Sequence, residues 1–107
     1  MHIPFRAALL CVLALLGLAA HAAPLPLVSP IFGDHMVLQQ GKPNPVWGWS
    51  APGTVVQVVI GTQTATATAG PDGRWQAEIQ PPPVGGPYEL KITAGTNAVA
   101  CEDVLVG

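Results

Sequence analysis

Glycine and proline divide this chain into short segments, and that spacing constrains its fold more than any other feature. They supply 22 of the 85 residues from Ala23 to Gly107. They cluster, as in residues 70–73 (GPDG) and 81–87 (PPPVGGP), between short runs that alternate or are rich in valine and threonine. Such punctuation is typical of all-β domains. The pattern predicts an immunoglobulin-like (Ig-like) antiparallel β-sandwich of seven or eight strands.

Two successive runs predict a hairpin. Residues 54–60 (TVVQVVI) are largely apolar on both faces, so we expect a central strand there. Gly61-Thr62 suits a two-residue type II′ turn because glycine comes first. The next run, 63–69 (QTATATA), has threonine on one face and alanine on the other, which predicts a strand with a small inner face.

The remaining runs are assigned in the same way. Residues 36–39 and 46–49 are predicted as short strands, and residues 24–30 as an edge strand or a linker. Residues 98–106 form one interrupted strand or two, split at Glu102-Asp103. Period-two alternation predicts a set of inward-facing side chains: Trp75, Ala77, Ile79, Tyr88, Leu90, Ile92 and Ala94.

The first 22 residues have the pattern of a cleavable secretory signal peptide. Residues 7–20 carry no charge and follow Arg6, but 14 residues are fewer than the roughly 20 that span a membrane. Ala20-His21-Ala22 is a small-residue cleavage site. We therefore expect residues 1–22 to be removed and residues 23–107 to form one exported domain, periplasmic or extracellular.

The charge pattern excludes two classes of protein. Beyond residue 22 there are three basic residues and six acidic ones, a net charge of −3 with His35 neutral. No basic patch exists, so we expect no nucleic-acid partner. No second long apolar run exists, so we expect no membrane partner once the signal peptide is removed.

A search for catalytic chemistry finds little. Beyond residue 22 the serines are Ser29 and Ser50 and the histidine is His35. Ser29, His35 and Asp34 could be written as a triad, but side chains on one turn rarely converge and no nucleophile turn surrounds either serine. His35 is expected to be a turn residue. We predict no catalytic, cofactor-binding or metal-binding residue and no cofactor.

Cysteine leaves two interpretations open. Cys11 would be lost with the signal peptide, which leaves Cys101 without an intrachain partner. We expect a small buried residue. The alternative is a disulfide partner on chain beyond this sequence.

Three tryptophans have two possible roles. Flat indoles on a β-sandwich can stack against sugar rings, but large aromatic residues also dominate small cores. Trp75 alternates with inward-facing residues and is predicted to be core. Trp47 and Trp49 share one face, for which we favour the core and keep a sugar-binding surface as the alternative.

The order of the residues resembles a known family. Residues 26–40 read PLVSPIFGDHMVLQQ, followed by PVWGW (45–49), APG (51–53), DGRW (72–75) and GGPY (85–88). The chain ends EDVLVG. This resembles the amino-terminal part of the sialate O-acetylesterase family, secreted carbohydrate acetylesterases of the SGNH-hydrolase type.

The resemblance implies an accessory role. Such enzymes begin with an exported β-sandwich and continue into an α/β catalytic domain, whose nucleophile lies in a Gly-Gln-Ser-Asn-like turn. No position here matches a catalytic residue of the family. We therefore expect a non-catalytic accessory domain, truncated before its SGNH-type catalytic domain, which would be its partner. The whole enzyme would act on an O-acetylated sugar. The alternative is a free-standing secreted carbohydrate-binding or structural Ig-like module.

Overall fold

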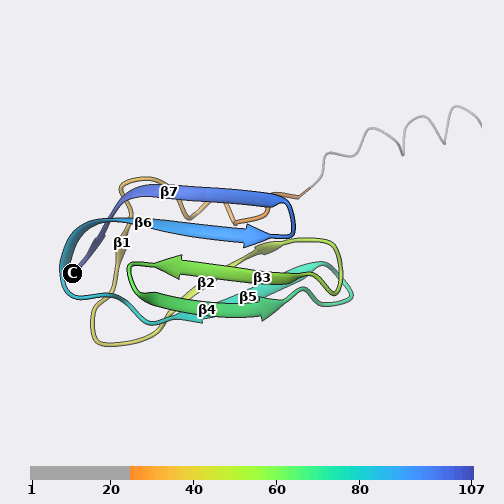
Figure 1. Cartoon of the computed structure of the whole chain (residues 1–107), viewed down its shortest axis with the longest axis horizontal. Helices are drawn as coiled ribbons and strands as arrows, with labels where there is room; N and C mark the ends of the chain where they lie inside the picture. The colour runs from red at the N-terminus through yellow and green to blue at the C-terminus, as the bar shows by residue number, and fades with distance from the viewer. Residues whose placement is uncertain (1–24) are drawn as a thin grey trace, which may run out of the picture.

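The computed structural model describes residues 25–107, which form an all-β domain with no helix in that range (Figure 1). The predicted signal peptide (1–22), including Cys11 and the cleavage site after Ala22, lies outside the described residues. Within residues 25–107 the search for a helix long and apolar enough to cross a membrane finds none.

Seven strands make two sheets that share one core. The strands are β1 (Val37–Leu38), β2 (Asn44–Trp49), β3 (Val55–Ile60), β4 (Gln63–Thr68), β5 (Arg74–Ile79), β6 (Gly85–Ala94) and β7 (Asn97–Val106). The larger sheet has the order β1-β7-β6-β3-β4, and the smaller sheet pairs β2 with β5. In Figure 1 the smaller sheet lies behind β3 and β4.

The core follows the predicted alternation. Val56, Val58 and Ile60 of β3 are fully buried and pack with Leu90 and Ile92 of β6 in one cluster. Each such side chain contributes about 1.5–3 kcal/mol when it leaves water. The other predicted inward positions, Trp75, Ala77, Ile79 and Ala94, are also buried, and Tyr88 packs against the cluster from its edge.

The β3–β4 hairpin has the predicted turn. Gly61 has a φ of +57°, whereas Thr62 is not among the residues with positive φ, which is the combination that a type II′ turn requires. β3 is paired on both sides, with β4 and β6, as predicted. On β4 the threonines are exposed, and Ala65 and Ala67 pack against the core.

The prediction of a wholly antiparallel fold is wrong at one edge. β1 pairs with β7 in parallel, with Val37 opposite Leu105. The segment before β1 follows the edge of β2, because the N–H of Ser29 donates to the carbonyl of Trp47 at 2.9 Å. The chain then crosses to the other sheet and meets β7 in the same direction. Of the two alternatives predicted for residues 24–30, an edge strand or a linker, the described part is not assigned as a strand, although it hydrogen-bonds along the edge of β2.

Residues 97–106 form one strand with a β-bulge. Leu90 pairs with Cys101 and Tyr88 pairs with Val104, so Glu102 and Asp103 together face the single residue Glu89. Asp103 has a φ of +54°, in the left-handed region that aspartate tolerates better than most residues. The interruption predicted at Glu102-Asp103 is therefore a bulge and not a break.

Candidate functional site

A pocket lies where β2 ends, beside the β4–β5 turn. It has a volume of about 380 Å³, within the range of small-ligand sites. The lining combines apolar surface with a few polar groups: Leu25, Leu27, Trp49, Ser50, Ala51, Pro52, Asp72, Gly73 and Asn97. Trp49 is the one aromatic residue in this lining, and its indole combines an apolar ring with a hydrogen-bond donor.

The local sequence builds this pocket wall. Asp72 accepts a hydrogen bond from the N–H of Arg74 at 2.9 Å, and Gly73 has a φ of +82°. The N–H of Ser50 donates to the carbonyl of Gly73 at 2.8 Å. These contacts join the 70–73 turn to the end of β2 and hold Ser50 and Trp49 at the pocket.

Trp47 and Trp49 lie on the outer face of β2, so the expectation that they belong to the core is wrong. Both are partly exposed, whereas Val46, on the opposite face of the strand, is fully buried. Trp47 also packs against Phe32, with ring centroids 4.8 Å apart and planes at 83°. Both faces of β2 therefore carry apolar side chains: one face packs on the core, and on the other face Trp47 packs against Phe32.

Trp75 is core, as predicted. Its side chain is 1% exposed, and its indole Nε1 donates to the carbonyl of Leu27 at 2.9 Å. A buried indole N–H needs such an acceptor. Trp75 therefore anchors the segment before β1 to β5.

The structure does not bring Ser29, His35 and Asp34 together as a catalytic triad. His35 Nδ1 contacts Asp103 Oδ2 at 2.7 Å, and Asp34 Oδ1 instead accepts the N–H of Glu102 at 2.8 Å. Ser29 is 5% exposed, and in the described part of the chain no hydrogen bond joins it to His35. Among residues 25–107, therefore, neither serine is hydrogen-bonded to this histidine.

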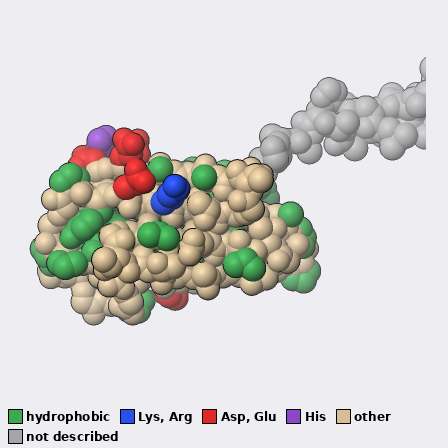
Figure 2. All heavy atoms as spheres, viewed as in Figure 1, with side chains coloured by type: hydrophobic (Ala, Val, Ile, Leu, Met, Phe, Trp, Pro, Cys, Tyr) green, Lys and Arg blue, Asp and Glu red, His purple; other side chains and the backbone are tan. Residues whose placement is uncertain are grey.

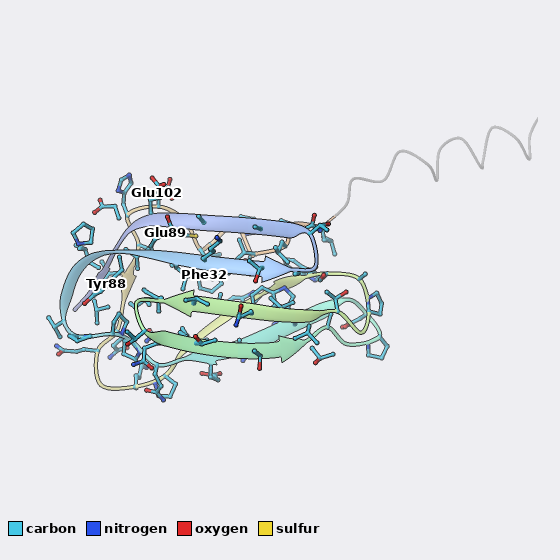
Figure 3. The ribbon with its side chains drawn as sticks, viewed as in Figure 1. Phe32, Tyr88, Glu89 and Glu102 are labelled. Atoms are coloured by element: carbon cyan, nitrogen blue, oxygen red, sulfur yellow. The ribbon has the colours of Figure 1, made fainter. Side chains whose placement is uncertain are left out.

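No local pattern in the sequence predicts the His35–Asp103 contact, because the two residues are 68 positions apart. Asp103 raises the pKa of His35, first through their hydrogen bond and then through its charge. Figure 2 shows the histidine beside a group of acidic side chains, and Figure 3 shows Glu89 and Glu102 at this end of β6 and β7. Across residues 25–107 no cluster of His, Cys, Asp or Glu is arranged to hold a metal ion.

Cys101 is a buried, free thiol at 2% exposure. Burial raises its pKa, and the charge of Asp34 adds to the effect. The expectation of a small buried apolar residue is confirmed, and the geometry gives no reactive thiolate.

Exposed apolar side chains gather near Gly107. Val37 is 63% exposed and lies in register with Leu105, which is 43% exposed. Val84 is 60% exposed and precedes Gly85, which pairs with Val106. We call Val37, Val84 and Leu105 the apolar end. Figure 2 shows hydrophobic side chains at the end of the domain where Figure 1 marks the C-terminus.

Comparison with known proteins relates the chain to solved structures but to no family model. No protein-family model matches the chain, and no curated protein matches it. Among solved structures the chain is similar to a novel carbohydrate acetylesterase from Xanthomonas citri, with 36% sequence identity and a TM-score of 0.68. The match covers 80% of this chain and 19% of that enzyme, so the chain spans about a fifth of its length. The relationship to acetylesterase-type proteins is therefore supported by both sequence and structure.

Proposed function

We propose that this chain is the accessory β-sandwich of an exported enzyme of the sialate O-acetylesterase type. The enzyme would remove O-acetyl groups from sialic acid or a related sugar. The observation that carries the proposal is the 36% identity to a carbohydrate acetylesterase across 80% of this chain. The run PLVSPIFGDHMVLQQ at residues 26–40 supports the sialate-type assignment.

The sheet order supports an Ig-like assignment of the domain. In Ig-like sandwiches the third, sixth and seventh strands share a sheet, and the second and fifth strands lie in the other. Here β3, β6 and β7 share the larger sheet, while β2 pairs with β5. β4 extends the larger sheet beside β3, as the added strand of variable-type domains does.

The proposed role of the domain is to pack against a catalytic domain and orient it. The apolar end supplies a surface for such packing, because Val37, Val84 and Leu105 expose adjacent apolar area near Gly107. The domain itself is proposed to be non-catalytic. In support, Ser29 is buried and His35 is paired with Asp103 instead of a nucleophile.

The first test is the coding DNA through and beyond codon 107. We expect the reading frame to continue into a Gly-Gln-Ser-Asn-like turn. The encoded longer protein should hydrolyse an aryl acetate and an O-acetylated sialic acid, and the 107-residue chain should hydrolyse neither. Turnover by this chain that is abolished by Ser29→Ala, or a stop codon after Gly107 without such a frame downstream, would contradict the proposal.

Glycan binding is the second candidate function, and Trp49 favours it. Its partly exposed indole borders the 380 Å³ pocket together with Ser50, Asp72 and Asn97. Titration with neutral and acidic oligosaccharides should change the tryptophan fluorescence, and Trp49→Ala should remove that change. An unchanged response in Trp49→Ala would exclude this pocket, and Trp47→Ala tests the neighbouring indole.

A further inference from the structure

The outer edge of β4 presents unpaired backbone groups. β4 is the last strand of the larger sheet. The N–H of Ala69 donates to the carbonyl of Thr54 at 2.9 Å, and Gln63 pairs with Ile60 across the two-residue turn. In an antiparallel pair these hydrogen-bonded positions recur at every second residue. Residues 63, 65, 67 and 69 therefore direct their backbone groups toward β3.

It follows that the alternate residues direct their N–H and C=O groups away from the sheet. These are Thr64, Thr66 and Thr68, whose side chains are all exposed. No hydrogen bond from any part of the chain between residues 25 and 107 reaches their backbone groups. The free edge thus offers three donors and three acceptors in a row.

This edge lacks the features that usually protect a free strand. Residues 61–70 contain no charge and no proline, although both are common devices against strand addition. The other sheet edges differ. Residues 26–29 cover β2, β1 has only two residues, and β5 exposes Arg74 and Glu78.

We propose that a second copy of this chain pairs antiparallel with β4 about a two-fold axis at Thr66. Thr66 would lie opposite its own counterpart, and Thr64 would lie opposite Thr68 of the second copy. Each of these three pairs joins outward-directed backbone groups and exchanges two hydrogen bonds. The two five-stranded sheets would become one continuous sheet of ten strands.

The choice of a second copy as the partner rests on self-complementarity. With a period of two, the proposed register places threonine opposite threonine on the outer face and alanine opposite alanine on the inner face. Threonine pairs across neighbouring strands are favourable. Both edges are uncharged, so the two copies do not repel each other at the contact. A two-fold contact of this kind closes on itself as a dimer.

Sedimentation velocity over a concentration series tests the dimer on the purified chain. One edge is small, so we expect a weak dimer whose dissociation constant is on the order of 10–100 μM. The weight-average mass should rise from one chain to two and then stop. Thr66→Pro removes one outward N–H, and proline is tolerated in an edge strand. The midpoint of the monomer–dimer transition should therefore shift at least tenfold to higher protein concentration.

A charge exchange tests the register. The double variant Thr64→Lys/Thr68→Lys places like charges opposite each other and should stay monomeric, as should Thr64→Glu/Thr68→Glu. Mixing the two should restore dimers, because each lysine then faces a glutamate. Gln76→Lys, at an exposed position of β5, is the matched control and should dimerise like the parent chain. Circular dichroism checks that each variant is folded.

The proposal would be overturned by any of three results. The first is a parent chain that stays monomeric across the concentration series. The second is dimer formation by each charged double variant alone, or a mixture of the two folded double variants that fails to form dimers. The third is growth beyond two chains, since a closed two-fold contact stops there.

Discussion

His35 and Asp103 join two parts of the chain that are 68 residues apart, with Nδ1 and Oδ2 separated by 2.7 Å. Both residues have positive φ angles, +67° and +54°. Two further contacts involve Glu102: its N–H donates to Asp34 Oδ1, and its carbonyl accepts the N–H of His35. Together these bonds fasten the turn before β1 to the bulge of β7, and they fix where β1 enters the sheet.

The first prediction concerns the pH dependence of this contact. Asp103→Asn removes the charge but keeps a residue that tolerates positive φ. Because Asp103 raises the pKa of His35, the stabilisation is fully present below the unfolded pKa of about 6.5. It is lost as the pH rises through the higher folded pKa. The melting temperature of the variant should therefore fall below that of the parent chain more at about pH 5.5 than at about pH 8.5.

An NMR titration of the His35 ring checks the cause. Its pKa should move back toward 6.5 in Asp103→Asn. If the melting temperatures of the variant and the parent chain differ equally at both pH values, and the His35 pKa does not move, then the His35–Asp103 charge pair does not contribute to stability.

The second prediction concerns Gly48. A Cβ at this position would overlap the carbonyl oxygen of Leu27, so Gly48→Ala must displace the segment that covers the edge of β2. We expect a loss of about 3 kcal/mol in the free energy of unfolding. Urea unfolding measures this loss. Gly33→Ala is the control, since nothing lies within 4 Å of its Cβ and its φ is not in the left-handed region. A loss of equal size in both variants would contradict the steric reason.

Strand positions were predictable because alternation reports burial directly. β3, β5 and β6 each bury one face against the core, so every second residue is apolar. The turns at Gly61 and Gly73 were predictable for a similar reason, since their positive φ favours glycine. These signals act within a few residues of each other.

The orientation of Trp47 and Trp49 was not predictable, because both faces of β2 are apolar. Val46 is buried in the core and Gly48 lies against Leu27, whereas both indoles lie on the outer face, where Trp47 packs against Phe32. The parallel β1–β7 pair and the His35–Asp103 contact depend on residues far apart in the chain. Local periodicity carries no information about such contacts. The pocket is formed in the same way, by segments as distant as Leu25 and Asn97.

The third prediction concerns the reactivity of Cys101. Its thiol is buried and its pKa is raised, so little thiolate forms and a thiol reagent has no access. In a Cys11→Ser background at about pH 8, a chromogenic disulfide reagent should react with Cys101 only after urea unfolds the chain. Rapid reaction in the folded state would mean that β7 opens locally. The unfolded sample is the internal control for the reagent.

The last prediction concerns the carbonyl of Leu27, which accepts two hydrogen bonds. One comes from Trp75 Nε1 at 2.9 Å and the other from the N–H of Trp49 at 3.2 Å. Trp75→Phe removes the indole donor and leaves space in the core, so we expect a loss of about 2–3 kcal/mol in the free energy of unfolding. Trp49→Phe keeps the backbone donor and alters a partly exposed side chain, so its loss should be under about 1 kcal/mol.

A double-mutant cycle then tests whether the effect of Trp75→Phe depends on the position of the Leu27 carbonyl. Gly48→Ala already displaces the Leu27 carbonyl, so Trp75→Phe added to it should cost less than Trp75→Phe alone. Urea unfolding of the parent, both single variants and the double variant provides the four free energies. Strict additivity would mean that Trp75 stabilises the domain only by filling the core, and that the segment along β2 is held by its backbone hydrogen bonds alone.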